Sequence, residues 1–248
     1  MQKARWILQS CLFIIFITGC GRLGVRESAL RSRNRIIEKN VFSATGKLIT
    51  IKKDGKRYGC TAFAYKRSNY VYRFITAAHC VASDDRENKK IKILSKSLII
   101  YIENKSSKKY KARVVAVGYK GINDDLAILE AKLDRHIPIL ALAEDKISHW
   151  QSYVNVSYPT SADGNLFYGY VDQLNYDGSE DILLKIIGVY DPRGASGSAI
   201  VDFYSGKVIA ILVAMRADRQ RVIAIPISRF KRFEAKIMNG TYKYSISK

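Results

Sequence analysis

The sequence predicts an all-β fold, a barrel or sandwich of short strands, with one helix at its C-terminal end. From Val41 onward, runs rich in Val, Ile and Tyr alternate apolar with polar residues, which is the pattern of half-buried strands. Turn signals such as Asp-Gly at 177–178 and Ser-Gly at 205–206 separate some of these runs. The expected strands cover residues 47–52, 58–65, 70–77, 91–102, 111–117, 152–158, 167–174, 182–187, 198–203, 208–215 and 221–226.

A single helix is expected over Ser228–Asn239. Its apolar residues, including Phe230 and Phe233, fall on one face at helical spacing. The serine that opens this stretch can cap its start, and Gly240 can end it.

Composition indicates a globular protein with a strong positive charge. The chain has 248 residues, of which 48% are hydrophobic, so it has enough apolar material for a core. Lys and Arg number 42 against 22 Asp and Glu, giving a net charge of +20. This charge favours anionic partners such as membrane surfaces, acidic polymers or nucleic acid, and does not choose between them.

The N-terminus has the pattern of a secretory signal. Lys3 and Arg5 precede an apolar run that ends near Thr18, shorter than the ~20 apolar residues a membrane-spanning helix needs. Ile-Thr-Gly-Cys at 17–20 resembles a bacterial lipobox. The resemblance implies a lipoprotein signal peptide over residues 1–19 and lipid on Cys20. An ordinary signal peptide with an incidental cysteine is the alternative.

Residues 20–42 are expected to form a lipidated tether. Five arginines lie between residues 21 and 40, where strand alternation is absent. Such a segment suits the surface of an anionic membrane, although a solvated charged linker has the same composition. The expected location is therefore the bacterial cell envelope, on the periplasmic or extracellular face, with the protein anchored to a membrane by lipid.

The four cysteines agree with export. Cys11 would leave with the signal peptide and Cys20 would carry the lipid, so Cys60 and Cys80 remain. An oxidising compartment would allow this pair to form a disulfide. Two free buried thiols are the alternative.

Three short segments contain the residue types that nucleophilic acyl transfer requires. They are Thr-Ala-Ala-His-Cys at 76–80, Asp-Leu-Ala-Ile-Leu at 125–129 and Gly-Ala-Ser-Gly-Ser-Ala at 194–199. A serine hydroxyl needs a base such as imidazole, and the imidazole needs a carboxylate that fixes its tautomer. Each segment alone is also typical of a strand edge or a turn, so the three together carry the interpretation.

In this order, and with Gly59-Cys60 upstream, the segments resemble the trypsin-like (chymotrypsin-fold) serine proteases over residues 41–237. The resemblance implies two packed six-stranded antiparallel β-barrels, expected over residues 43–145 and 146–248. The first barrel would carry the His and Asp, and the second the Ser and the C-terminal helix. The family often has a disulfide where Cys60 and Cys80 stand.

The resemblance also implies catalytic roles. Ser196 would be the nucleophile, His79 the general base and then acid, and Asp125 the group that orients His79. Asp124 competes with Asp125, but the family places its Asp directly before an apolar-Ala-apolar run. The backbone N–H groups of Gly194 and Ser196 would form the oxyanion hole.

Substrate binding is expected to involve a pocket and an edge strand. By the family pattern Tyr190, six residues before the nucleophile, would lie at the base of the primary pocket. The expected preference is for an uncharged, apolar or small side chain. The edge strand that pairs with substrate backbone would contain Val213, Ala214 and Met215, and Met215 and Ala224 would line the pocket.

Ala195 departs from the activatable members of the family, many of which have Asp at this position. The chain is in that respect more similar to the bacterial HtrA-like and glutamyl-endopeptidase-like branches. Gly-x-Ser-Gly-Ser at 194–198 fits the glutamyl-endopeptidase-like branch, whereas the segments 206–211 and 224–226 look like the HtrA-like branch.

These features predict an exported, membrane-anchored serine endopeptidase that cleaves proteins or peptides through an acyl-enzyme. One alternative is a catalytically silent lipoprotein of the same fold that binds an anionic envelope partner. A nucleic-acid-binding module is the second alternative, disfavoured by the secretion signal. No cofactor is expected, and the Cys and His residues do not have metal-ligand spacing.

Overall fold

The computed structural model of the protein describes residues 31–85, 90–102, 108–118, 124–144, 146–158, 163–188, 193–216, 221–242 and 246–247. None of the helices in these ranges is long and apolar enough to cross a membrane. The expected signal peptide, Cys20 and Tyr190 lie outside the described residues.

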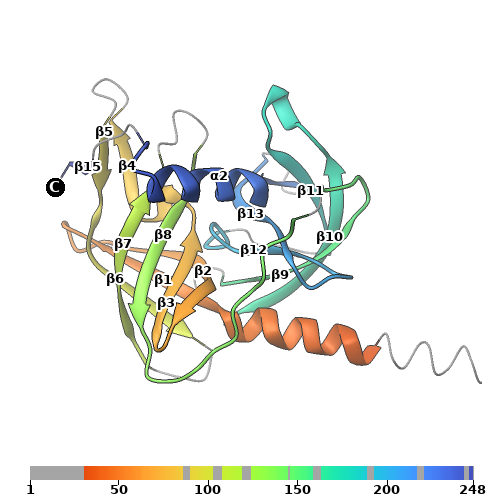
Figure 1. The fold of residues 1–248 in the computed structure, drawn as a ribbon, viewed down its shortest axis with the longest axis horizontal. Coiled ribbons are helices and arrows are strands. Elements are labelled where there is room, and N and C mark those ends of the chain that lie inside the picture. Colours follow the sequence, from red (N-terminus) through yellow and green to blue (C-terminus); the bar gives the residue numbers. More distant parts are fainter. Residues whose placement is uncertain are drawn as a thin grey trace, which may run out of the picture. The chain divides into compact units, whose positions relative to one another are not determined.

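Six antiparallel strands form the first closed barrel, in the order β1-β2-β3-β8-β7-β6 (Figure 1). Alternation of apolar and polar residues gives each strand a core face, as in β1, where Leu48 is fully buried. Phe63, Phe74 and Tyr72 fill the core. The strands are β1 (Thr45–Lys52), β2 (Arg57–Ser68), β3 (Val71–Thr76), β6 (Ser95–Ile102), β7 (Tyr110–Val117) and β8 (Ala127–Lys132).

The second closed barrel has the strand order β10-β11-β14-β13-β12-β9, also antiparallel. Its central strands are almost continuously apolar, because both of their faces are covered; six successive residues of β13 are buried. The strands are β9 (Ser152–Ser157), β10 (Asn165–Gln173), β11 (Ile182–Ile187), β12 (Ala199–Asp202), β13 (Val208–Met215) and β14 (Arg221–Pro226). The expected pair of six-stranded barrels is therefore confirmed.

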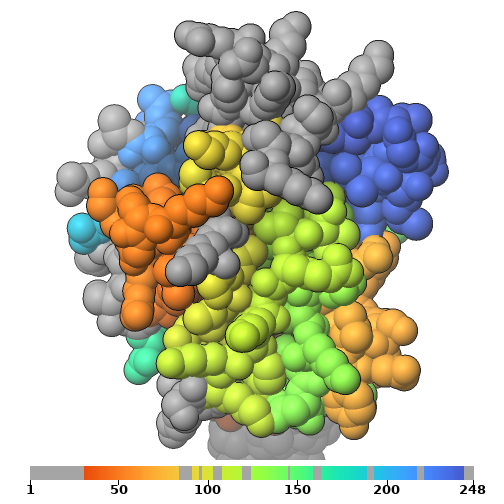
Figure 2. All heavy atoms as spheres, turned by 90° about the vertical axis from the view of Figure 1, so that its left-hand side faces the viewer, coloured from red at the N-terminus to blue at the C-terminus, as the bar shows by residue number. Residues whose placement is uncertain are grey.

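A small sheet of order β15-β5-β4 was not expected. It contains β4 (Ala82–Asp85), β5 (Lys90–Ile93) and β15 (Ile246–Ser247). The expected run 91–102 breaks at Leu94, whose N–H donates to Val81 O, so β5 leaves the barrel and β6 enters it. In Figure 2, the yellow and green residues of β6 and β7 cover much of the outer face of the first barrel.

The C-terminal helix α2 (Ile227–Met238) joins the two barrels. It follows β14 directly and packs on β2, with the Phe230 ring edge-on to Tyr65 at 5.3 Å. Glu234 accepts hydrogen bonds from Tyr65 Oη at 2.9 Å and from Lys66 Nζ at 2.7 Å.

The expected serine cap of α2 is wrong. The helix begins at Ile227, and Pro226 occupies the N-cap position, where no side chain caps the helix. Ser228 therefore lies within the first turn, because the fixed φ of proline lets the chain pass directly from strand to helix. Gly240, with φ of +66°, follows the end of the helix as expected.

Residues 31–44, which overlap the expected tether, form a helix that the sequence analysis did not predict. Val41 and Ala44 lie on one face of this helix and are buried. The arginines keep the preceding turns polar, so the apolar face becomes visible in the sequence only near the end of the helix.

Candidate active site

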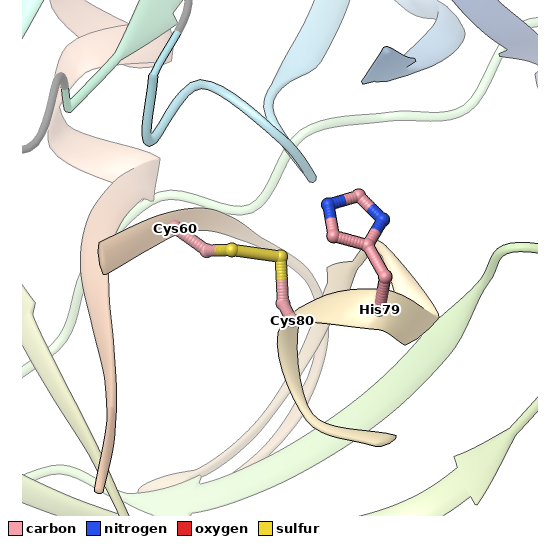
Figure 3. A group of neighbouring side chains, drawn as sticks. All are labelled: Cys60, His79 and Cys80. Atoms are coloured by element: carbon pink, nitrogen blue, oxygen red, sulfur yellow. A yellow bond between two sulfur atoms is a disulfide. The ribbon is translucent and has the colours of Figure 1, made fainter. Parts of the chain in front are cut away.

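His79 lies on a short 3₁₀ turn, η1 (Ala78–Cys80), that directly follows β3. A disulfide between Cys60 on β2 and Cys80 on this turn ties the two segments together (Figure 3). The His79 side chain remains 34% exposed, so one edge of the imidazole is accessible to a reactant.

Asp125 holds the imidazole through two hydrogen bonds. Its Oδ2 lies 2.8 Å from His79 Nδ1, and its Oδ1 accepts from the His79 backbone N–H at 2.9 Å. An ionised carboxylate only accepts hydrogen bonds, so His79 Nδ1 carries the proton in this pair and Nε2 keeps its lone pair. Asp125 is buried, which protects the contact from competing water.

Asp124 points to other partners. Its Oδ1 lies 3.3 Å from Arg229 Nε on α2, and its Oδ2 accepts from Tyr242 Oη at 3.3 Å. Arg229 Nη1 also donates to Asp181 Oδ1 at 3.1 Å. The two neighbouring aspartates therefore have separate environments: Asp125 faces the imidazole and Asp124 faces the helix.

Asp181 is a third carboxylate near Asp124 and Asp125, and it shares Arg229 with Asp124. Burial raises the pKa of the Asp181 carboxyl, the positive charge of Arg229 lowers it, and the negative charge of Asp125 raises it further. Arg229 therefore offsets part of the repulsion among the carboxylates.

Residues 193–197 form a tight turn before β12 that contains Ser196 and is called the serine turn below. Gly194 and Gly197 have φ of +90° and +88°, a conformation that other residues rarely adopt. A Cβ on Gly197 would also meet Thr61 O at 2.3 Å and Thr76 Oγ1 at 2.2 Å. The two glycines therefore let the serine turn approach the first barrel closely.

Ser196 is held next to the disulfide. Its carbonyl oxygen accepts from Thr61 N–H at 2.9 Å and lies 3.8 Å from Cys80 Sγ. Cys80 adjoins His79 in sequence, and a His79 ring nitrogen lies within 4.8 Å of both disulfide sulfurs. The structure thus brings the serine turn alongside the imidazole, although no hydrogen bond joins Ser196 Oγ to His79 among the described residues.

The backbone N–H groups of Gly194 and Ser196 have no acceptor in the described part of the chain. Donors near an activated serine are what a developing oxyanion requires.

The residues expected to bind substrate fall in two places within the described ranges, and Tyr190 lies outside these ranges. Val213, Ala214 and Met215 lie at the end of β13, past the last β12 partner at Ile211. Ala214 and Met215 pair with β14, whereas Val213 lies at a bulge in this pairing. Ala224 is fully buried within β14. Within the described ranges, no strand pairs with the other edge of residues 213–215, and this arrangement fits strand pairing with a peptide.

Cys60, His79 and Cys80 are the one group of potential metal ligands among the described residues (Figure 3). Both sulfurs are bonded to each other. Metal binding needs thiolates, so this group is not available as a ligand set while the disulfide is intact.

Thr61, Arg229 and Asp181 were missed by the sequence interpretation. Thr61 directly follows Cys60, yet its hydroxyl donates to Gly194 O, 133 residues away. Arg229 contacts Asp124 over a separation of 105 residues. No local sequence pattern predicts such contacts, because they depend on how the two barrels and α2 pack together.

The two closed barrels, with a His–Asp pair on one and a serine turn from the other beside it, define the class of trypsin-like serine endopeptidases. A family model described as a trypsin-like peptidase domain matches residues 60–211, more than half of the chain. The chain belongs to this family. Comparison with curated protein sequences finds no match.

Solved structures share the fold at low sequence identity. The active form of the Rv3671c protease from M. tuberculosis is 18% identical with a TM-score of 0.63, over 81% of this chain and 83% of that chain. The serine endoprotease from Yersinia pestis is 14% identical, TM-score 0.63, over 83% and 66%. The HtrA-type protease AlgW with tripeptide is 18% identical, TM-score 0.64, over 84% and 64%. The expected likeness to HtrA-type proteases is thus confirmed for the fold.

Proposed function

We propose that the protein is an exported, membrane-anchored serine endopeptidase whose catalytic triad is Ser196, His79 and Asp125. The observation that carries the proposal is the 2.8 Å contact of His79 Nδ1 with Asp125 Oδ2. The serine turn of the second barrel is held next to this pair by the hydrogen bond from Thr61 N–H, on the first barrel, to Ser196 O. The proposal combines three residue types from separate segments in one site, as nucleophilic acyl transfer requires.

In the proposed reaction, Ser196 Oγ attacks the carbonyl carbon of the scissile peptide and gives its proton to His79 Nε2. The new C–O bond turns the carbonyl into an oxyanion, which accepts hydrogen bonds from the N–H groups of Gly194 and Ser196. Asp125 stabilises the imidazolium through Nδ1–H. The C–N bond then breaks, and the proton from Nε2 passes to the leaving amine.

The second half of the reaction repeats these steps with water. His79 takes a proton from the water, whose oxygen attacks the acyl carbon of the ester on Ser196. When the second tetrahedral intermediate collapses, the ester C–O bond breaks and the proton returns to Ser196 Oγ. A carboxylic acid leaves and the enzyme is regenerated.

The proposed substrate is an extended peptide or an unfolded protein segment. The open edge at residues 213–215 supports this, since a peptide can add to it as a further strand with its backbone hydrogen bonds satisfied. Cleavage at an uncharged side chain remains the proposed preference, tested by cleavage-site mapping in a peptide library. Cleavage confined to Lys or Arg would contradict this preference.

The proposed location is the cell envelope, with lipid on Cys20. The signal-like N-terminus supports this location, and the Cys60–Cys80 disulfide suits an oxidising compartment. A Cys20→Ser variant is expected to leave the membrane fraction at high salt. Retention by basic charge alone at low salt would identify the anionic surface as a second anchor. Membrane retention of this variant at high salt would contradict lipid anchoring.

The triad is tested with a fluorophosphonate probe. Activated serine displaces fluoride from phosphorus, forming an O–P bond while its proton passes to the histidine. Labelling is expected for the wild type and for Ser205→Ala, a control in the β12–β13 turn, and not for Ser196→Ala or His79→Ala. An oxidised, folded wild type that stays unlabelled would contradict the proposal and favour a silent, partner-binding protein.

A further inference from the structure

Thr61 connects the first barrel to the serine turn through its hydroxyl and its backbone N–H. It lies on β2, is fully buried, and directly follows Cys60. Its hydroxyl donates to Gly194 O at 2.8 Å and accepts from Tyr158 N–H at 3.0 Å. Its backbone N–H donates to Ser196 O at 2.9 Å. One residue therefore anchors the carbonyls on both sides of Ala195.

The carbonyl of Gly194 is the one that most needs an anchor. Glycine has no Cβ and rotates with little steric resistance, so the peptide after Gly194 could turn over. Rotation would turn over the Ala195 N–H, which lies in the same peptide plane. It would also shift the adjoining peptides, which carry the N–H groups of Gly194 and Ser196. The hydroxyl of Thr61 accepts and donates at the same time, so its direction is fixed by Tyr158, and this in turn fixes the Gly194 carbonyl.

Thr61 is also connected to the segment that carries His79. Thr76 Oγ1 donates to Thr61 O at 2.8 Å, and Thr76 lies three residues before His79. The space that a Gly197 side chain would need is filled by these same two threonines. Thr61 is therefore hydrogen-bonded both to the strand that precedes His79 and to the turn that carries Ser196.

We propose that Thr61 is a positioning residue that keeps the oxyanion hole formed before substrate arrives. The Thr61 hydroxyl holds the Gly194–Ser196 segment with its N–H groups available to the oxyanion. This role rests on the proposed function, in which those N–H groups stabilise the transition state. A hydroxyl is required, because valine has the same shape and cannot make either side-chain hydrogen bond.

The test compares Thr61→Val and Thr61→Ser with Thr45→Val. Thr45 is a matched control: it lies on β1, is also fully buried, and its hydroxyl donates to a backbone carbonyl, that of Val41, at 2.7 Å. For each variant, the rate of fluorophosphonate labelling is measured against probe concentration, which separates probe binding from the chemical step. The thermal midpoint of unfolding is measured in parallel.

Thr61→Val is expected to label about 10- to 100-fold more slowly at saturating probe, because misplaced donors lose transition-state stabilisation. Half-saturation by the probe is expected to stay unchanged. Thr61→Ser, which keeps the hydroxyl, is expected to label at close to the wild-type rate. Thr45→Val is expected to lose thermal stability without losing labelling rate.

Two results would overturn the role of Thr61 alone: wild-type labelling by folded Thr61→Val, or slow labelling by Thr61→Ser. The serine variant decides the question if the valine variant does not fold. Failure of the wild type itself to label overturns the proposed function, and the role of Thr61 with it.

Discussion

Arg229 Nε lies 3.3 Å from Asp124 Oδ1, so the C-terminal helix contacts the residue directly before Asp125. The same guanidinium reaches Asp181, and its side chain is only 11% exposed. Helix α2 therefore holds the loop that presents a carboxylate to His79, although it lies at the far end of the sequence.

Replacing Arg229 by Gln is expected to reduce stability by about 3 kcal/mol, because the buried carboxylate of Asp124 and the half-buried carboxylate of Asp181 lose their cation. Proteolytic activity is also expected to fall, since the loop that carries Asp125 is no longer held. Arg232→Gln is the control. Arg232 lies on the same helix as Arg229, and its ion pair with Glu180 is more than half exposed and is worth about 1 kcal/mol or less. Urea unfolding and fluorophosphonate labelling measure both effects. Equal losses in the two variants would contradict a special role for Arg229.

The raised pKa of Asp181 predicts that the free energy of unfolding depends on pH. Burial raises the pKa of its carboxyl above the unfolded value, so the folded state binds the proton more tightly. The contribution to the free energy of unfolding is therefore fully present below the unfolded pKa and is lost as the pH rises through the folded pKa.

The Asp181→Asn variant is expected to lack this loss, so the difference in the free energy of unfolding between wild type and variant should decrease as the pH rises through the folded pKa. In Arg229→Gln it should extend to higher pH, because the cation no longer lowers the pKa of Asp181. Urea unfolding across the acidic range measures both curves. An Arg229→Gln curve that is displaced to lower pH would contradict this assignment of charges.

Gly197→Ala is expected to abolish labelling by the fluorophosphonate. The new Cβ would combine a positive φ with contacts below 3 Å to Thr61 and Thr76, so the serine turn must move away from the first barrel. Gly178→Ala separates the effect of positive φ from the effect of the close contacts. Gly178 also has a positive φ, +71°, but the space around its Cβ position is open.

The control variant is expected to lose about 1 kcal/mol from backbone strain and to stay active. Gly197→Ala should lose roughly 1–3 kcal/mol more from overpacking. An active Gly197→Ala protein would show that close approach of the serine turn is unnecessary.

Removal of the disulfide by a Cys60→Ser, Cys80→Ser double variant is expected to lower stability by roughly 3 kcal/mol, from the 20-residue separation of the cysteines. Labelling should fall at elevated temperature, since Cys80 adjoins both His79 and the carbonyl of Ser196. Thermal unfolding with and without a reducing dithiol measures the effect. The double variant should be insensitive to the dithiol, and a wild type that is equally insensitive would contradict the prediction.

Strand positions could be predicted because alternation is a local property of the chain. Residues 182–187, 208–215 and 221–226 form strands with the predicted bounds. The helix over 31–44 escaped prediction because its polar, arginine-rich turns hide a short apolar face. The small sheet escaped because two-residue strands such as β15 carry too little pattern to distinguish them from a loop.

The sequence by itself determined the two-barrel family, the candidate histidine, aspartate and serine, and the cysteine pair, since each lies in a short motif. Only the tertiary structure decided the partners of these residues: Asp125 with His79, Asp124 with Arg229, and the serine turn with Thr61. Hydrogen bonds between distant segments depend on barrel closure and helix docking, which bring side chains more than 100 residues apart to within about 3 Å. The motifs identify the candidate side chains, and the packing of the barrels and α2 decides which of these side chains are in contact.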